Sequence, residues 1–532
     1  MVQQQNQFDQ SLMHTLADIP RYYAQVSPHG KALTFEGKTT NWAELDAATD
    51  DVARALLSIA KPGERIAYVG KNSDEFFKLM FGIAKAGMST VPIIWRLAPA
   101  EIAAIVTDSD APILFVAPDQ FATLDDIKAA IPKRCLVVSL QEKHDSIPYF
   151  PEWIAANNHG QDLPDIDAKS IAWQLYTSGT TGKPKGVMLS HDNILKGRRE
   201  GMGKNMAWYD WLLGDVSLVA LPMGHVGGIG WGVVGLMNGA HTIVQREFSP
   251  AAVLAAIHQD GITKLFLVPT TLQMLLLQPN INQIDFSRLR HVLYGAAPIA
   301  LDLLREAAKI FGCGFCQQYG ATETCGTIVY LPPEDHDVNG NPRMRAAGLP
   351  MPGVEIRIVS PDDRKILAPH QVGEVETRSA ANMVGYWKLP EETARTLSAD
   401  GWLRTGDAGY VDEDGYLYIY DRFKDMICTG AENVYPAEVE SAIYGHPAVQ
   451  EVAVIGVPDD KWGESVKAII VPKPGIEVDP AEIIAFARTR IAGFKVPKSI
   501  DIAESLPRSP SGKILRRMLR DPFWVGRERR VN

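Results

Sequence analysis

Positive charge is in short supply in this sequence. Lys and Arg together number 53 against 63 Asp and Glu, so the formal net charge is −10. A protein that binds nucleic acid through its phosphates needs a basic surface. We therefore expect no nucleic-acid partner.

Cysteine is also scarce, with five residues in the whole chain. A sparse and odd set predicts reduced thiols and a cytoplasmic location. Cys313 and Cys316 form a single CxxC, but no second cysteine or histidine pair lies nearby. Because a structural zinc site needs about four ligands, we expect both cysteines to be packing residues.

Signals for targeting and for membrane insertion are missing. The first ten residues, MVQQQNQFDQ, lack the basic region of a signal peptide. Residues 216–245 carry no charge but include Pro222 and seven glycines. A membrane helix needs about 20 mostly apolar residues. We expect no transmembrane segment and interpret this stretch as a buried wall or pocket lining.

Segments typical of strands and of helices alternate along the chain. Residues 65–69 are apolar and predict a strand, and residues 75–87 have apolar positions at helical spacing. The alternation recurs between residues 250 and 320, and it predicts an α/β fold with largely parallel sheets. In such sheets ligands bind beyond the carboxyl ends of the strands, where the glycine-rich and polar segments of this chain fall.

The sequence changes character at the charged stretch DRFKD, residues 421–425. The segment that follows has its own strand and helix patterns. We therefore predict two domains, comprising residues 1–421 and 422–532.

The most specific segment is YTSGTTGKPKG, residues 176–186. Glycines and small hydroxyl residues allow backbone N–H groups to close on phosphate oxygens, and two lysines add positive charge. Only two residues separate Gly179 from Gly182, so the segment is not the GxxxxGK[ST] loop of P-loop kinases. It indicates a phosphate-binding loop, with a flexible surface loop as the alternative.

A second segment is QQYGATET, residues 317–324. Tyr319 can stack on a purine, and Thr322 can hold a phosphate oxygen. Glu323 can hold Mg²⁺, which takes few protein ligands beside phosphates and water. The alternative for Glu323 is an acid at a helix N-terminus.

Two further segments each present one charged residue. GWLRTGD ends in Asp407, which can bind ribose hydroxyls with help from Arg422. PRSPSGK ends in Lys513, which proline and glycine would hold in a presented loop. Taken singly, a turn aspartate and an exposed tail lysine are the alternatives.

Together these segments resemble, in content and order, the adenylate-forming superfamily of acyl-CoA synthetases, luciferases and adenylation domains. The resemblance covers nearly the whole chain. It implies a large N-terminal domain of layered α/β subdomains plus a distorted β-barrel, and a small mobile C-terminal α+β domain. It also implies an AMP-forming acyl-CoA ligase. Such an enzyme uses ATP and Mg²⁺ to make an acyl-AMP and then passes the acyl group to coenzyme A.

The resemblance assigns a role to each matching residue. The phosphate loop would comprise Thr177, Ser178, Gly179, Thr180, Thr181, Gly182, Lys183 and Lys185. The adenine slot would comprise Gly295, Ala296, Ala297, Pro298, Gln318, Tyr319 and Gly320. The remaining implied roles are phosphate contact for Thr322, Mg²⁺ binding for Glu323, ribose binding for Asp407 and Arg422, bridging of the substrate carboxylate and α-phosphate for Lys513, and gating of the acyl pocket for His225.

Further implied roles concern the thiol step. A glycine turn at Gly430 resembles the turn at the family's pantetheine tunnel, and Trp462, Phe494 and Lys498 match positions that contact coenzyme A. Core packing is the alternative for Trp462 and Phe494. Lys424 matches the family's pivot, about which the small domain would rotate.

The absence of charge in residues 216–245 also bears on the acid. Adenylation domains for amino acids resemble this region but carry an aspartate there for the ammonium group, and a buried ammonium without a counter-charge is costly. We therefore expect an apolar carboxylic acid, in the manner of fatty-acid and aryl-acid ligases. The glycines at positions 224, 227, 228 and 230 either open the pocket or permit close packing.

Alternatives remain at this level. One is an acyl-AMP ligase that loads a carrier-protein thiol, and another is a nucleotide-binding homologue that has lost catalysis. The sequence is also compatible with a homodimer. The context of Lys513 resembles sites of reversible acetylation, so a lysine acetyltransferase is an expected partner.

Overall fold

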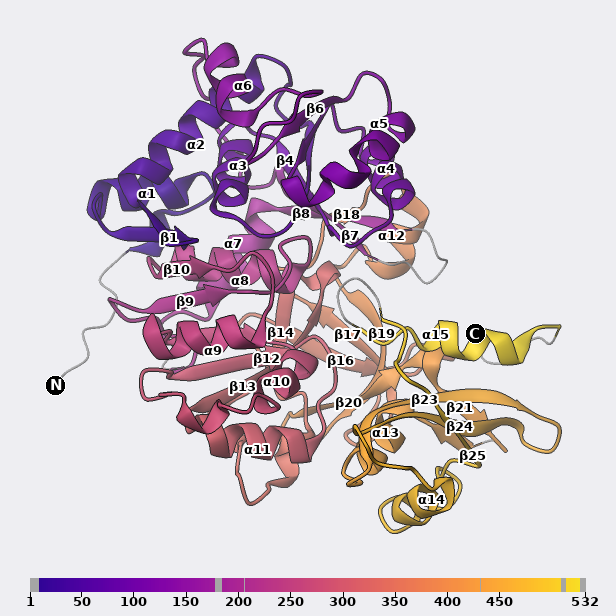
Figure 1. The fold of residues 1–532 in the computed structure, drawn as a ribbon. Helices are drawn as coiled ribbons and strands as arrows, with labels where there is room; N and C mark the ends of the chain where they lie inside the picture. The colour runs from indigo at the N-terminus through magenta and orange to yellow at the C-terminus, as the bar shows by residue number, and fades with distance from the viewer. Residues whose placement is uncertain (1–8, 178–183, 205, 431, 509–512, 527–532) are drawn as a thin grey trace.

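The computed structural model describes residues 9–177, 184–204, 206–430, 432–508 and 513–526 (Figure 1). Two large sheets with their helices and one small antiparallel sheet make up the chain as far as residue 422. A fourth sheet with three short helices follows it. Within the described residues, no helix combines the length and the apolar character that crossing a bilayer requires.

The first large sheet has seven strands in the order β18-β8-β7-β4-β3-β5-β6. The strand predicted at residues 65–69 is β3, and the helix predicted at 75–87 is α3 (Asp74–Lys85). The Ser73 hydroxyl accepts a hydrogen bond from the Phe76 N–H at 3.1 Å and so caps the start of α3. The strands are β3 (Arg65–Val69), β4 (Ser89–Ile93), β5 (Ile113–Val116), β6 (Leu136–Ser139), β7 (Ile171–Thr177), β8 (Lys185–Ser190) and β18 (Gly385–Tyr386).

The second large sheet has nine strands in the order β15-β14-β13-β12-β11-β9-β10-β1-β2. Its six central strands run parallel, as predicted. The pairs at the edges are antiparallel, which agrees with a sheet predicted to be largely parallel. Short connections produce hairpins between β1 and β2 and between β13 and β14. The strands are β1 (Lys31–Phe35), β2 (Lys38–Asn41), β9 (Val216–Val219), β10 (His241–Val244), β11 (Lys264–Leu267), β12 (His291–Gly295), β13 (Gly314–Ala321), β14 (Gly326–Leu331) and β15 (Leu349–Pro350).

Helices cover the faces of these two sheets. They are α1 (Asp18–Val26), α2 (Trp42–Leu57), α4 (Pro99–Asp108), α5 (Leu124–Ala130), α6 (Phe150–Asn157), α7 (His191–Glu200), α8 (Val226–Met237), α9 (Pro250–Gln259), α10 (Pro269–Leu276) and α11 (Leu301–Phe311).

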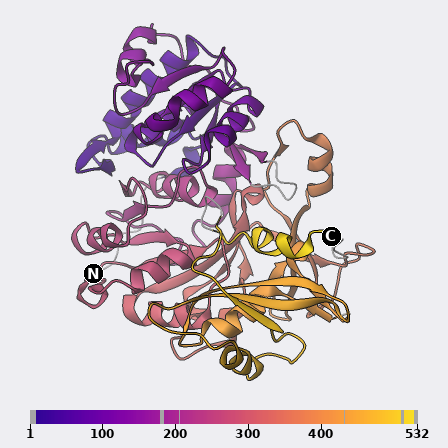
Figure 2. The same cartoon turned by 45° about the vertical axis from the view of Figure 1, so that its right-hand side comes forward.

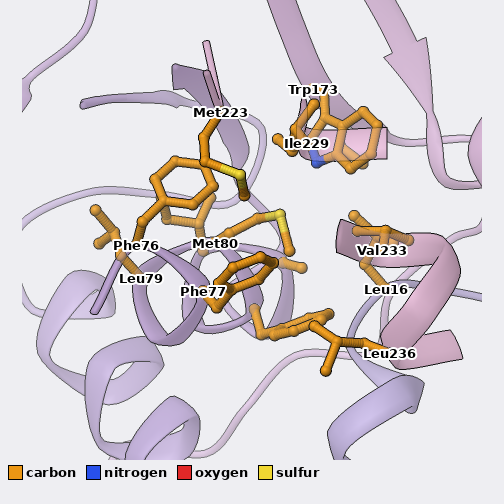
Figure 3. Packing of buried hydrophobic residues seen from close by; sticks show 14 of the residues in the cluster. Leu16, Phe76, Phe77, Leu79, Met80, Trp173, Met223, Ile229, Val233 and Leu236 are labelled. Atoms are coloured by element: carbon orange, nitrogen blue, oxygen red, sulfur yellow. The ribbon is translucent and has the colours of Figure 1, made fainter. Parts of the chain in front are cut away.

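The main hydrophobic core lies where α3 meets α8, as Figure 3 shows. Phe77 of α3 and Ile229, Val233 and Leu236 of α8 belong to this cluster, and all four are fully buried. A Cβ on Gly232 would fall 2.7 Å from the Phe77 ring, so the glycine allows this close contact. The uncharged stretch 216–245 is thus a buried wall, as the sequence analysis interpreted it.

A four-stranded antiparallel sheet stands in the place expected for the distorted barrel. Its strands and those of the neighbouring β14 enclose a small core that includes Ile328, Ile358, Val375 and Leu417. Its elements are β16 (Glu355–Val359), β17 (Gly373–Arg378), β19 (Leu403–Val411) and β20 (Leu417–Arg422), and α12 (Pro390–Thr396) precedes β19.

The C-terminal elements form a small α+β unit with its own core. Figures 1 and 2 show it beside the later, pink-to-orange part of the large body and apart from the indigo N-terminal part. We propose the division into residues 1–421 and 422–532 because β20 ends at Arg422 and the new sheet begins at Ile427. Its elements are β21 (Ile427–Thr429), β22 (Glu432–Val434), β23 (Val449–Asp459), β24 (Gly463–Pro472), β25 (Ser499–Ile502), α13 (Pro436–Tyr444), α14 (Pro480–Arg488) and α15 (Arg516–Arg520).

Candidate active site

A cleft of about 2100 Å³ lies between the large body and the small unit. The carboxyl ends of β7, β12 and β13 line one side, where the sequence analysis expected ligands to bind. The small unit supplies Lys513 and neighbouring residues to the other side. The polar segments that are far apart in the sequence therefore meet in one cavity.

The predicted phosphate loop connects β7 and β8, whose ends pair antiparallel at Thr177 and Lys185. Ser178, Gly179, Thr180, Thr181, Gly182 and Lys183 lie outside the described residues. Thr177 and Lys185 both line the cleft. Lys185 forms an ion pair with Glu392 of α12, which is 207 residues away in the sequence and was not predicted.

The two segments predicted to form the adenine slot are neighbours. Gly295 ends β12, and a Cβ on it would lie 2.1 Å from the Gln318 carbonyl oxygen of β13, so only glycine permits this approach. Ala296 follows with φ of 66°, a conformation that non-glycine residues adopt mainly at constrained functional sites. Ala296, Ala297, Pro298, Gln318, Tyr319 and Gly320 all line the cleft.

Tyr319, Asp407 and Arg422 form a linked group at the cleft wall. The Tyr319 hydroxyl donates a hydrogen bond to Asp407 Oδ2 at 2.6 Å, and Arg422 Nε lies 3.6 Å from Oδ1. Burial raises the pKa of Asp407, while the nearby Arg422 charge opposes that rise. Asp407 lies within β19 opposite Arg422 of β20, so the alternative of a turn aspartate is wrong.

Glu323 and Thr322 lie in a single 3₁₀ turn, residues Thr322–Thr324, directly after β13. The Tyr386 hydroxyl donates a hydrogen bond to Glu323 Oε1 at 2.9 Å. Tyr386 comes from β18, 63 residues later in the chain. No sequence pattern indicated this tyrosine, because only the folding of β18 onto β8 brings it to the site.

Lys513 faces the same group of charges. It lies at the cleft and remains accessible to solvent, yet the surroundings are crowded enough that burial lowers its pKa. Arg422 lowers the pKa further, whereas Asp407 and Glu323 favour the charged form. Three residues later, Arg516 forms ion pairs with Glu440 at 2.7 Å and with Asp421 at 3.4 Å, which anchors this stretch.

His225 caps the N-terminus of α8. Its Nδ1 accepts a hydrogen bond from the Gly227 N–H at 3.1 Å, so the neutral ring carries its proton on Nε2. Burial lowers the pKa of His225 to about 4, and the nearby Lys513 lowers it as well. The ring is therefore neutral at physiological pH.

The four glycines around His225 divide into two kinds. A Cβ on Gly224 would meet the Ile94 backbone nitrogen at 2.8 Å, and one on Gly228 would meet the Pro222 oxygen at 2.1 Å. These two permit close packing. A Cβ on Gly227 would lie 3.3 Å from the His225 and Phe266 rings, so this position is also tight. Gly230 lines the cavity, and its Cβ would meet only the Arg198 side chain, at 3.2 Å, so at this position the missing side chain leaves room.

The inner part of the cavity has aromatic walls. The ring centroids of Trp211 and Trp231 are 5.6 Å apart, and Trp231 lies 6.3 Å from Phe266. Two cations that the sequence analysis did not consider also line it, Lys264 and Arg198. Both lie outside the uncharged stretch, so that stretch alone did not describe the pocket.

Three of the four residues predicted for the thiol step, Gly430, Trp462 and Lys498, lie together and away from the cleft. The Gly430 N–H donates a hydrogen bond to the Trp462 carbonyl at 2.9 Å, and Lys498 Nζ lies 4.6 Å from the Trp462 ring centre. None of Gly430, Trp462, Phe494 and Lys498 is among the described residues that line the cleft. Trp462 and Phe494 are each 40% exposed, so core packing does not explain them.

Lys424 lies in a 3₁₀ turn, Phe423–Asp425, between the last strand of the large body and the first of the small unit.

The cysteines are packing residues, as predicted. Cys316 is fully buried in the core, and burial raises the pKa of Cys313 to about 12, so that thiol stays protonated.

Comparison with known proteins gives full-length matches. The family profile described as AMP-binding enzyme matches residues 21–387, and the AMP-binding enzyme C-terminal domain matches residues 438–513. The chain is 41% identical to the fatty acid–[acyl-carrier-protein] ligase ScoC of Streptomyces coeruleorubidus, covering 98% of both chains. It is 36% identical to a feruloyl-CoA synthase of an Amycolatopsis species, covering 96% of this chain and 99% of the relative.

A solved structure agrees with these matches. The anthranilate CoA ligase AuaEII, in complex with anthranoyl-AMP, superposes with a TM-score of 0.88 at 27% identity, covering 97% of this chain and 99% of that one. The two family models include Thr177, Lys185, Tyr319, Glu323 and Lys513 of the cleft, whereas Asp407 and Arg422 lie between the two matched ranges. This chain belongs to the AMP-binding enzyme family of the adenylate-forming superfamily.

Proposed function

We propose that this protein is an AMP-forming acid–thiol ligase that makes an acyl-AMP from ATP and a carboxylic acid and then transfers the acyl group to coenzyme A. The observation that carries the proposal is the meeting of Lys513, Asp407 and Glu323, from two domains, in one cleft. An anionic nucleophile that attacks an anionic phosphate needs cations to offset the repulsion. Lys513 supplies one where the two groups would meet.

In this scheme the residues of the cleft bind the nucleotide and orient it toward the acid. Ala296 to Pro298 and Tyr319 would hold the adenine, while Asp407 and Arg422 would hold the ribose. Thr177 and Lys185 flank the loop that would close on the outer phosphates, and Thr322 would contact one of them. The neutral His225 lines the same cleft within the electrostatic reach of Lys513, which fits a gate for the acyl group.

The donor set at Glu323 fits Mg²⁺. The described residues contain no cluster of three or more His, Cys, Asp or Glu side chains that could hold a metal. Mg²⁺ commonly binds one or two carboxylates and completes its shell with phosphates and water, so the single carboxylate of Glu323 is sufficient. When bound, the ion would neutralise charge on the pyrophosphate leaving group.

Tyr386→Phe is expected to raise the Mg²⁺ concentration needed for half-maximal pyrophosphate release by about tenfold. The change removes the hydrogen bond that orients Glu323, and a bond to a charged group contributes about 1.5–3 kcal/mol. A Mg²⁺ titration of the first half-reaction measures the effect. If the rate at saturating Mg²⁺ falls and the Mg²⁺ dependence stays the same, Tyr386 does not act through Glu323.

The thiol step needs a second arrangement of the small domain. We propose that Gly430, Trp462, Phe494 and Lys498 form the coenzyme A surface, and that the domain turns about Lys424 to bring it to the cleft. Lys513 and Gly430 belong to the same domain, and the first lies at the cleft while the second does not. One rigid placement therefore cannot serve both half-reactions.

The aromatic cavity favours an acid with a largely apolar acyl group, either fatty or aromatic. Both kinds are named among the relatives, as the fatty acid ligase and the feruloyl-CoA synthase. The 41% identical relative is named as an acyl-carrier-protein ligase, so loading of a carrier-protein thiol is a second candidate.

We also propose a cytoplasmic location, a homodimer, and reversible acetylation of Lys513 by a lysine acetyltransferase.

The proposed function is tested by product analysis. With Mg²⁺, ATP, coenzyme A and a panel of apolar acids, we expect AMP, pyrophosphate and an acyl-CoA. Chromatography that shows ADP and phosphate would contradict the proposal. Substituting a holo carrier protein for coenzyme A distinguishes the second candidate, which predicts acyl transfer to the carrier and none to coenzyme A.

A further inference from the structure

Arg198 is one of two cations of the acyl cavity that the proposed function does not use. It comes from α7 and lines the cavity opposite α8. A Cβ on Gly230 of α8 would lie 3.2 Å from Arg198 Nη2, so one edge of the guanidinium faces the open side of that helix. The following argument rests on the proposed function, because it concerns the acid that this cavity accepts.

Not every N–H group of the Arg198 guanidinium has a hydrogen-bond partner within the described residues. Nη1 donates to the Ile194 carbonyl and, at 3.5 Å, to the Cys325 Sγ, and Nη2 donates to the Cys325 carbonyl at 3.2 Å. A guanidinium has five N–H groups, so three have partners and two, on Nη2 and Nε, have none within the described residues. Arg198 also has no carboxylate within ion-pair distance in that part of the chain.

Two other charged residues near Arg198, Lys264 and Glu200, do not accept hydrogen bonds from its remaining N–H groups. Lys264 donates to the backbone carbonyls of Trp208 at 2.8 Å and Asp210 at 2.6 Å, so it holds the wall of the pocket in place. Burial lowers its pKa to about 7. Glu200, on the same helix as Arg198, points to Gly353, where a Cβ would lie 1.3 Å from its Oε2. Neither residue partners Arg198.

An acyl group without polar atoms would displace water from the remaining N–H groups and would provide no hydrogen-bond acceptor in its place. A buried donor left without a partner destabilises the complex, and more so when the donor is charged. An oxygen at that place would instead accept charge-assisted hydrogen bonds, which the planar guanidinium makes well in pairs. The rest of the acyl group would still contact the rings of Trp231 and Phe266.

We propose that Arg198 is a specificity-determining residue, and that the preferred acid carries a second acceptor oxygen, as a carboxylate or a carbonyl, on the distal part of an otherwise apolar acyl group. The acid would thus be an oxo acid or a dicarboxylic acid rather than a plain fatty acid. Its reacting carboxylate lies on the Lys513 side of His225, and its distal oxygen meets Arg198.

The test compares matched acids in the pyrophosphate-release assay. Butanoic to decanoic acids are each offered as the plain acid, as the oxo acid with the carbonyl next to the terminal methyl, and as the dicarboxylic acid. At one chain length or more, the wild-type protein is expected to prefer an oxygenated acid by about tenfold in kcat/KM, as for a site that hydrogen-bonds its substrate. Whether the oxo acid or the dicarboxylic acid is preferred shows whether the distal acceptor is a carbonyl or a carboxylate.

Two variants connect that preference to Arg198. In Arg198→Met the ratio between oxygenated and plain acid is expected to fall to about one. Gly230→Ala keeps Arg198 and its carbonyl contacts but places a methyl group against Nη2, so the ratio should fall there too. Lys196→Met, an exposed position on the same helix, is the control and should keep the wild-type ratio.

The outcomes are distinguishable. Pyrophosphate release with plain acids, and no preference for any oxygenated acid, overturns this inference and leaves the proposed function standing. A preference that survives in Arg198→Met also overturns it. Absence of pyrophosphate release with every acid overturns the proposed function and the inference together.

Discussion

Replacing Lys513 with alanine is expected to slow acyl-AMP formation by about 10²-fold or more, which is the usual effect of removing one charged contact to a transition state. Lys513 lies at the cleft beside Asp407 and Glu323, where the carboxylate and the α-phosphate would meet. Acyl transfer from chemically prepared acyl-AMP to coenzyme A should continue, because Lys513 would leave the cleft in that step. Pyrophosphate release and thioester formation are measured separately.

The control for this variant is Lys473→Ala, an exposed lysine of the same domain. It removes an equal charge far from the cleft and should leave both half-reactions at the wild-type rate. An equal loss of both half-reactions in Lys513→Ala would argue that the lysine supports the domain as a whole. Acetylation of Lys513 removes the same charge and should reproduce the alanine variant.

Replacing Lys424 with proline is expected to leave a single turnover of acyl-AMP formation intact and to reduce acyl-CoA formation by on the order of 10²-fold. Proline fixes φ near −65°, which lies within the range of a 3₁₀ turn such as Phe423–Asp425. The observed arrangement, with Lys513 at the cleft, should therefore tolerate the change. The rotation that brings Gly430 to the cleft should not, because a hinge residue must change its backbone angles.

Lys424→Gln is the matched control, since it removes the charge but keeps the backbone freedom. It should lower acyl-CoA formation much less than the proline variant does. A pyrophosphate burst followed by slow thioester formation in Lys424→Pro is the expected signature. Normal turnover with coenzyme A would show that the pivot lies at another residue or that the domain does not rotate.

Much of the fold could be predicted from local patterns. β3 and α3 were expected from residues 65–69 and 75–87, because a short apolar run and apolar positions at helical spacing both report on which residues are buried. The sheets were predicted to be largely parallel, but which edge strands are antiparallel was not predicted, because strand direction depends on the length and course of connections rather than on the strand's own residues.

The site was predictable where its residues lie in continuous motifs. Asp407, Glu323 and Lys513 were assigned from short segments that together resemble one family, and the structure brings all three to one cleft. Tyr386, Glu392 and Arg198 were missed, because each contacts the site from an element with no motif of its own. Their positions follow only from how β18, α12 and α7 pack.

By itself the sequence determined the family, the nucleotide chemistry and the neutral character of the stretch 216–245. These properties depend on the types and spacing of residues within short segments, so they can be recognised without knowing how the rest of the chain folds. Only the tertiary structure decided that Lys513 lies at the cleft while Gly430 does not, and that Arg198 of α7 and Lys264 of β11 line a pocket with aromatic walls. Such facts depend on long-range packing of segments up to hundreds of residues apart, and on the low-dielectric surroundings that the packing creates.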